Sequence, residues 1–261
     1  MMFVESACLP QDLNRTKELG FSLAIVEGVS AANGGNDPFV LATRRTIKLE
    51  NTYDSVFQAL VQARKEVDVV AIRGDDAALL RRLMENHRTM SRTIDVLQID
   101  LDQVFGLKPS VVQFLLKHFG LVLELNLAQL LTMGADRQRM LVNARHVVRT
   151  LVRRRGGRLR LILTGYGKRS PSELCAIVSL FGITEADAEQ SLSANIHTLV
   201  VHAKRQRQAY LEQLAAQASL GMLASLQTNS QKKRLSPVTA TEVSEAQEEA
   251  RKRVLLVKAW I

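Results

Sequence analysis

Short apolar runs alternate along the first two hundred residues with segments in which apolar residues recur every three or four positions. The runs are rich in Val, Ile and Leu, which is typical of strands that are buried on both faces. The pattern predicts strands at 2–6, 22–27, 41–48, 67–72, 95–100, 121–126, 159–164 and 198–201. Because the segments between them have the helical period, the strands are expected to form a parallel sheet.

The helical segments have recognisable beginnings and ends. Pro109 and Pro171 suit a first helical turn, where a missing N–H costs nothing. Thr184 is a capping residue with Asp187 three positions on. Gly156-Gly157 ends the helix whose apolar stripe runs from Met140 to Leu151. Further helices are predicted at 11–19, from 53, after Asp76 and after Pro109.

Eight strand-and-helix units within about 205 residues favour a compact (β/α) TIM-like barrel, an α/β fold. An open doubly wound sheet has the same local pattern and stays as the alternative. It is disfavoured because neither Gly-x-Gly-x-x-Gly after the first strand nor Gly-x-x-x-x-Gly-Lys occurs.

The character of the chain changes after the barrel pattern, which we assign to 1–210. A helical extension is predicted at 211–226, a polar flexible linker at 227–240 and a C-terminal helix at 241–261. The last helix ends in apolar residues that need a surface to cover. It either packs on its own barrel or docks on a partner, and the sequence favours neither.

Positive charge is concentrated in one stretch. The chain has 35 Lys and Arg against 26 Asp and Glu, a net charge of +9, and residues 137–169 hold eleven basic residues with no Asp or Glu. A charged helix face on its own is usually a solvated surface. Since no carboxylate balances this one, a polyanion-binding surface is favoured, most plausibly for nucleic acid.

Catalytic chemistry is poorly supported by the residues at the predicted strand ends. The candidates there are Glu5, Glu27, Asp100, Asp102, Glu124 and His202. A metal-dependent phosphoesterase acting on a nucleotide or nucleic acid would draw on Asp100, Asp102, Glu124 and His202. Such a centre needs several converging His and carboxylate ligands, but His202 is the one histidine predicted at a strand end. We therefore expect no catalytic residue, no metal and no cofactor, and the phosphoesterase stays as the alternative function.

Two further features narrow the class of protein. Cys8 and Cys175 lie far apart, which indicates neither a disulfide framework nor a zinc site and is consistent with a reducing compartment. No apolar run approaches the length of a membrane span, so we expect no membrane contact. The first residues resemble neither a secretory signal nor a transit peptide.

The stretch 181–207 carries the most specific motif in the chain. Its elements are Phe181-Gly182-Ile183-Thr184, Asp187-Ala188, Ser193-Ala194-Asn195, Leu199-Val200-Val201-His202 and Lys204-Arg205. It resembles the closing segment of the roughly 30-kDa barrel subunit of ribonuclease P and ribonuclease MRP, which has Phe-Gly-Leu-Ser-x-x-Asp-Ala, Ser-x-Asn and an apolar strand ending in His.

The resemblance extends upstream and covers about residues 1–210. The similar segments are Leu41 to Ile47, Val67 to Ala71, Ile99-Asp100-Leu101, Leu123-Glu124-Leu125 and Arg169-Ser170-Pro171. One departure follows the last predicted strand, where His202-Ala203-Lys204-Arg205-Gln206 stands in place of the family's His-Gly-Glu-Thr-Arg.

The resemblance implies a barrel of the polymerase-and-histidinol-phosphatase type that has lost its metal ligands. It implies a protein cofactor of a ribozyme-type endoribonuclease, not an enzyme, that supports precursor tRNA or precursor rRNA cleavage. The implied partners are a structured catalytic RNA and other protein subunits, including a small RRM-like one. The implied location is the nucleus, in the nucleolus.

Basic residues in or beside the loops are the expected RNA contacts. They would neutralise phosphates without reading bases, because too few aromatic residues are present for a stacking platform. The predicted RNA-binding residues are Arg44, Arg45, Arg137, Arg139, Arg153, Arg154, Arg155, Lys168, Arg169, Lys204, Arg205 and Arg207.

Overall fold

The computed structural model describes residues 2–28, 38–49, 52–74, 93–99, 101, 121–127, 130, 136–149, 161–164 and 169–232. The chain divides into two units, Met1–Arg207, here called the barrel unit, and Gln208–Ile261. The strands are β1 (Val4–Cys8), β2 (Leu23–Glu27), β3 (Val40–Lys48), β4 (Val69–Arg73), β5 (Val96–Ile99), β6 (Val122–Asn126) and β7 (Leu161–Thr164). The helices are η1 (Pro10–Asp12), α1 (Leu13–Glu18), α3 (Tyr53–Glu66), α8 (Arg137–Val147), α9 (Pro171–Ser179), α10 (Glu185–Ser191) and α11 (Ala194–Lys232).

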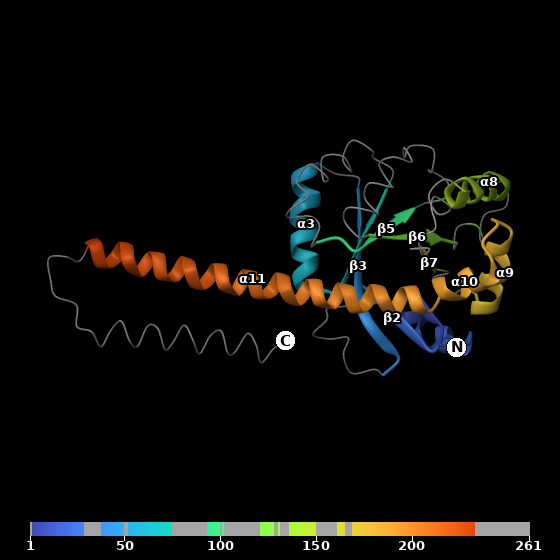
Figure 1. The fold of residues 1–261 in the computed structure, drawn as a ribbon, viewed down its shortest axis with the longest axis horizontal. Helices are drawn as coiled ribbons and strands as arrows, with labels where there is room; N and C mark the ends of the chain where they lie inside the picture. The colour runs from blue at the N-terminus through green and yellow to red at the C-terminus, as the bar shows by residue number, and fades with distance from the viewer. Residues whose placement is uncertain are drawn as a thin grey trace. The chain divides into compact units, whose positions relative to one another are not determined.

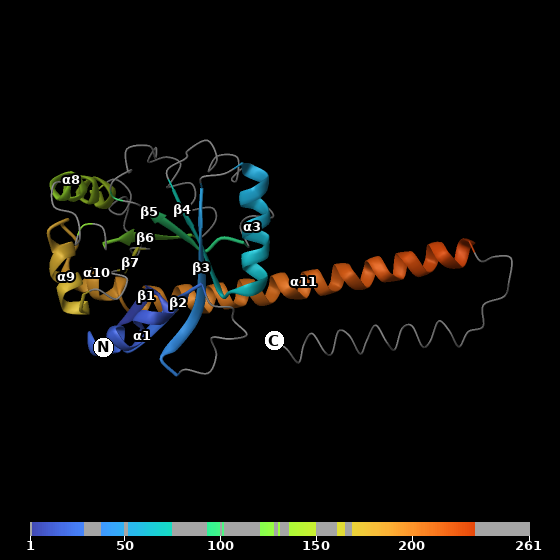
Figure 2. The ribbon, with the colours of Figure 1, turned by 180° about the vertical axis from the view of Figure 1, so that it is seen from behind.

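The seven described strands form a nearly closed parallel barrel. Each strand pairs with the next one in the sequence, from β1 to β7. The sheet curls until β7 lies next to β1, where the Thr164 hydroxyl donates to Glu5 at 2.6 Å. Figures 1 and 2 show α3 on one side of the strands and α8 with α9 on the opposite side. The predicted α/β TIM-like barrel is confirmed, with a helical C-terminal part.

The predicted eighth strand at 198–201 is wrong. These residues belong to α11, which begins at Ala194. Leu199 and Val200 are buried, whereas Thr198 and Val201 are exposed, as expected for one face of a helix and not for a strand buried on both faces. A four-residue apolar run fits either structure, so its periodicity alone could not separate them.

The first turns of α11 close the barrel at the amino ends of the strands. Its buried residues Ile196, Leu199, Val200 and Ala203 pack with inward-facing residues of the strands in one cluster, among them Val4, Ile25, Ala42, Val69, Val96 and Ile162. The Asn195 amide donates to the Leu161 carbonyl at 2.8 Å, and the Lys204 ammonium donates to the Leu41 carbonyl at 3.0 Å. Both carbonyls lie where strands begin, so the helix occupies the amino end.

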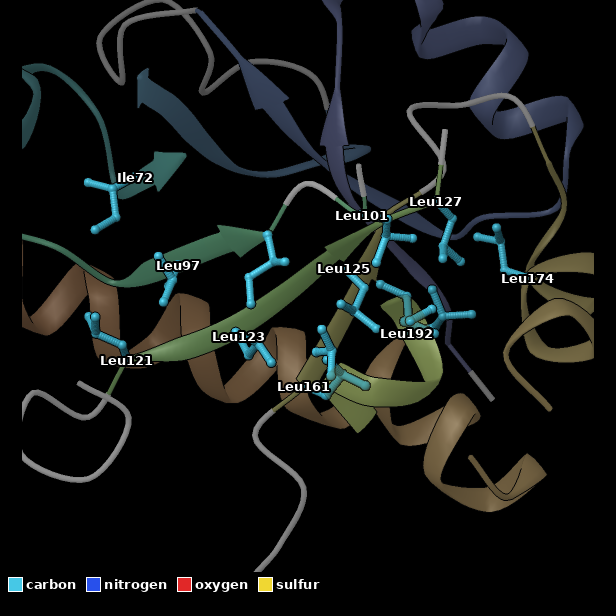
Figure 3. Packing of buried hydrophobic residues seen from close by; sticks show 14 of the residues in the cluster. Ile72, Leu97, Leu101, Leu121, Leu123, Leu125, Leu127, Leu161, Leu174 and Leu192 are labelled. Carbon is cyan, nitrogen blue, oxygen red and sulfur yellow. The ribbon is translucent and has the colours of Figure 1, made fainter. Parts of the chain in front are cut away.

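A second apolar cluster lies between the outside of the barrel and its helices. Figure 3 shows Leu97, Leu123, Leu125 and Leu161 of β5, β6 and β7 within it, together with Leu174 of α9. Alternate residues of one strand therefore enter the inner and the outer cluster, since successive side chains of a strand point to opposite faces. This explains why the strands have continuous apolar runs.

Several predictions differ from the structure or lie outside it. Helix α11 continues to Lys232, into the segment 227–240 predicted as a linker. The helices predicted after Asp76 and Pro109 and the turn at Gly156-Gly157 lie outside the described residues. No helix in the described part of the chain has both the length and the apolar character to cross a membrane.

Candidate functional site

The interior of the barrel becomes polar toward the carboxyl ends of the strands, the end at which (β/α) barrels place their active sites. We call this group the inner polar cluster. It comes from five strands and consists of Glu5, Glu27, Arg44, Thr46, Glu124 and Thr164. Arg44 is fully buried, and so are Glu5, Glu124 and Thr164.

Arg44 links the carboxylates of this cluster. Its Nη1 and Nη2 donate to the two oxygens of Glu124, the latter at 3.2 Å. Its Nε lies 3.2 Å from Glu27 Oε2 and donates to the Thr46 hydroxyl at 3.2 Å. Glu27 also accepts from the Thr46 N–H at 2.5 Å and from the Thr46 hydroxyl at 2.8 Å. A two-pronged guanidinium–carboxylate pair is strong and directional, so Arg44 is held in one orientation.

Arg44, which the sequence analysis predicts as an RNA contact, does not lie at the surface of the barrel. Its guanidinium is buried and is occupied by Glu124 and Glu27, so it cannot reach a phosphate at the surface. Its neighbour Arg45 is exposed and pairs with Glu66 at 2.7 Å. Adjacent residues of a strand point to opposite faces, and only the position of β3 in the barrel decides which arginine faces inward.

The structure separates the residues of the alternative phosphoesterase centre. Glu124 lies in the inner polar cluster, but His202 is exposed on α11, at the opposite end of the barrel. Its predicted place at a strand end is therefore wrong, because residues 198–201 belong to helix α11 and not to a strand. Asp100 and Asp102 lie outside the described residues. Across the described ranges, no group of three or more His, Cys, Asp or Glu side chains is placed to hold a metal.

A second buried ion pair was not predicted from the sequence. Arg64 of α3 donates to Asp95 at 2.7 Å and to the Asp68 carbonyl at 3.0 Å, and the Val70 N–H donates to Asp95 at 2.8 Å. Burial raises the pKa of the Asp95 carboxyl, and Arg64 and the Val70 N–H oppose that rise. A signal was present, because Arg64 occupies a position of the buried stripe of α3.

One group of predicted RNA contacts lies toward the amino ends of the strands. We call Arg45, Lys204, Arg205 and Arg207 the amino-end basic set. Arg207 pairs with Asp68 at 3.5 Å and donates to the Lys65 carbonyl at 3.0 Å. Arg205 is exposed and, among the described residues, forms no ion pair. Within the described residues, Arg205 is therefore the member of this set whose guanidinium is most accessible to a phosphate.

A second group follows the carboxyl ends of β6 and β7. We call Arg137, Arg139 and Arg169 the carboxyl-end basic set. All three are exposed, but Arg139 pairs with Asp136 and Arg169 with Glu173, both at 3.2 Å. Arg137 forms no ion pair with any residue that the structure describes. Arg153, Arg154, Arg155 and Lys168 lie outside the described residues. The predicted contacts thus do not form one surface within the described part of the chain.

The motif around residue 181 has a structural explanation. Gly182 has φ +84°, a backbone conformation that favours glycine, and it connects α9 to α10. Thr184 caps α10 by accepting the Asp187 N–H at 3.2 Å, which confirms the predicted cap. Phe181 and Ile183 are buried, and Asn195 bonds to β7 as described above. These residues build the corner that directs α11 across the barrel end.

A comparison with protein-family models shows the family of this chain. A family model described as RNase P subunit p30 matches residues 6–208. A search among curated proteins finds no match. The matched range begins in β1 and ends just after the barrel unit. It includes the motif around residue 181 and every residue of the inner polar cluster except Glu5. The chain therefore belongs to the RNase P subunit p30 family.

Proposed function

We propose that this chain is a non-catalytic, RNA-binding subunit of the ribonuclease P and ribonuclease MRP ribonucleoproteins. In this role it supports cleavage of precursor tRNA at its 5′ end, or of precursor rRNA, by the RNA component. Family membership supports a place in such a particle. The proposed partners are the structured catalytic RNA and other protein subunits, including a small RRM-like one, in the nucleus and its nucleolus.

The arrangement of Arg44 supports a non-catalytic role. A metal-dependent phosphoesterase needs carboxylates that are free to bind cations at the carboxyl end of the barrel. Here the Glu124 carboxylate is bound on both oxygens by the Arg44 guanidinium, and Glu27 is bound by Arg44 and Thr46. The positive charge inside the barrel thus comes from a side chain.

The exposed arginines support RNA binding through phosphates. Arg137 and Arg205 lie on opposite ends of the barrel unit and form no ion pair within the described residues. Cations that are not already neutralised release counterions when they bind phosphates, and they contribute most to affinity at low salt. Such contacts orient a structured RNA without reading its sequence.

Recovery of RNA with the chain tests the proposal. The tagged chain is purified from the cells in which it occurs, and the bound RNA is sequenced. We expect strong enrichment of one or two structured RNAs, together with other protein subunits. Recovery of the chain without any enriched RNA would contradict the proposal.

The alternative function is tested on the purified chain alone. With Mg²⁺ or Mn²⁺ added, we expect no turnover of precursor tRNA or of a simple phosphoester. Turnover that the substitution Glu124→Gln abolishes would show instead a barrel phosphoesterase.

A further inference from the structure

The unit Gln208–Ile261 contains the part of α11 that follows the barrel unit, and one face of this helical segment is half-buried. The half-buried side chains on this face are Leu211, Leu214, Ala215 and Ser219, while Gln208, Glu212, Gln217 and Leu220 around them are exposed. We call these four residues the α11 stripe. Their spacing of three and four places them on one face of the helix.

We propose that residues 241–261 form an antiparallel helix that docks on the α11 stripe of the same chain. The partner of the stripe would then be the chain's own C-terminal segment. This docking would require neither the barrel unit nor RNA. This assignment is independent of the proposed function, since it concerns only the unit Gln208–Ile261.

The apolar pattern of the C-terminal segment matches the stripe. Residues Val243, Ala246, Ala250, Val254, Val257 and Ile261 recur at helical spacing. The larger ones lie near the end, where an antiparallel return brings them back to the part of α11 that carries the stripe. Facing them there are the small residues Ala215 and Ser219, and large side chains pack well against small ones.

The connection has the right length. Because α11 continues to Lys232, only residues 233–240 separate it from the segment. Loops of two to about eight residues commonly join antiparallel helices. At 1.5 Å per residue, 208–232 spans about 37 Å and 241–261 about 31 Å, so the segment fits within the length of the helix. A return around such a loop places residue 254 near residue 219.

Charge favours the same direction. The segment begins with Glu242, Glu245, Glu248 and Glu249, whereas the end of α11 and the start of the loop carry Lys232, Lys233 and Arg234. An antiparallel return brings these opposite charges together. It also places the acidic first turn where the positive end of the new helix dipole favours it.

The tether selects this occupant over a second copy of the chain. Two segments joined by a short linker meet at an effective concentration in the millimolar range. A second copy would have to overcome the loss of translational freedom at its much lower concentration. The docking is therefore expected within one chain, even in dilute solution.

Disulfide formation between engineered cysteines tests the pairing and its direction. In a full-length chain carrying Cys175→Ser, the pair Ser219→Cys and Val254→Cys is oxidised at low protein concentration. Ala250→Cys and Val257→Cys, each combined with Ser219→Cys, cover one turn in either direction. The control pair is Gln217→Cys with Val254→Cys, because Gln217 is exposed on the opposite face of α11. Cys8 is buried and stays in place.

Fluorescence of Trp260, the one tryptophan in the sequence, tests docking without crosslinking. We expect blue-shifted emission that acrylamide quenches weakly in the unmodified chain. Leu214→Glu should shift the emission to the red and raise the quenching constant severalfold. Leu220→Glu, at an exposed position of the same helix, should change neither.

Every result decides the proposal. An intrachain disulfide with Ser219→Cys but not with Gln217→Cys, together with protected Trp260 fluorescence, supports it. Disulfide-linked dimers would show that a second copy occupies the stripe. Equal reaction of both pairs would show an undocked tether. Failure of all three Ser219→Cys pairs, or solvent-exposed Trp260 in the unmodified chain, would also overturn it.

Discussion

Arg44 and Arg45 are neighbours on β3 with opposite environments. Replacing Arg44 by Met leaves Glu27 and Glu124 inside the barrel without their cation. Removing one partner of a buried pair costs about 3–5 kcal/mol, so we expect a loss of that size in the free energy of unfolding. Urea denaturation of the full chain measures it.

Arg45→Met is the matched control, since it removes the same charge from the same strand. The pair of Arg45 with Glu66 is exposed, with 47% and 38% of the two side chains accessible. Such a pair contributes about 0–1 kcal/mol. Equal losses for the two variants would contradict the role of Arg44 in holding the inner polar cluster together.

The buried thiol of Cys8 is expected to lower the stability of the folded chain at alkaline pH. Burial raises the pKa of its thiol from 9.0 to about 11, and the nearby Glu5 adds to the rise against a hydrogen bond with Thr16. Between these values the unfolded chain loses the thiol proton while the folded chain keeps it, so stability falls as pH rises from about 9 to about 11.

The expected loss from Cys8 is on the order of 1–2 kcal/mol. Urea denaturation at several pH values measures the free energy of unfolding. Comparison with Cys8→Ala separates the contribution of the Cys8 thiol from that of other groups that titrate in the same range. The Ala variant should show a correspondingly smaller loss between pH 9 and 11. An identical pH dependence in both chains would exclude the thiol as its source.

At the scale of elements, α11 acts as the closure of the barrel. Leu199 is buried in the apolar cluster that α11 forms with the inward-facing strand residues, so Leu199→Ala should destabilise the chain by about 2–5 kcal/mol. Val201, two residues on, is 51% exposed, and Val201→Ala should change stability by less than about 0.5 kcal/mol. Thermal unfolding of both variants measures the difference. The reverse order would fit the discarded strand and not the helix.

The two basic sets lie at opposite ends of the barrel unit, so the proposed contribution of each set to RNA binding can be tested separately. Arg137→Ala and Arg205→Ala each remove an exposed arginine that forms no ion pair among the described residues. If the end carrying it binds RNA, each should lower affinity and reduce the slope of log affinity against log salt by about 1.

Arg15→Ala is the control for loss of charge alone, because Arg15 is exposed on α1 and outside both sets. Filter binding with the co-purified RNA at several salt concentrations gives affinity and slope together. If Arg137→Ala and Arg205→Ala both behave like Arg15→Ala, then neither basic set takes part in the RNA interface.

At the scale of the whole molecule, RNA binding and the C-terminal segment are expected to be independent. Residues 241–261 contain four acidic and four basic side chains, so their deletion leaves the net charge of +9 unchanged. Since phosphate binding follows charge, a chain ending at residue 240 should bind RNA within about twofold of the full chain, with the same salt slope. A large change in either quantity would place the segment at the RNA.

The order of strands was predictable because both faces of each strand are buried, so that its apolar run is continuous and short. Seven strands fall within a few residues of their predicted bounds. Glu5 and Glu27 could be placed at the carboxyl end because each follows the last apolar residue of its run, whereas Glu124 is followed by Leu125 within its run. Arg64 and Asp95 were missed as a pair, since the two residues lie far apart in sequence, and the local pattern shows only that Arg64 falls on the buried stripe of α3.

The local sequence by itself determined the α/β class, the parallel strands and the cap at Thr184, since these depend on neighbours in sequence. The approach of β7 to β1 decided between a barrel and an open sheet, which have the same local pattern. Only the tertiary structure decided which of Arg44 and Arg45 faces inward, because the inside of a barrel exists only after its strands have closed. It also decided that 198–201 is helical, as the closed barrel offers the apolar end that Leu199 and Val200 cover. Burial against distant residues, which no local pattern encodes, made both choices.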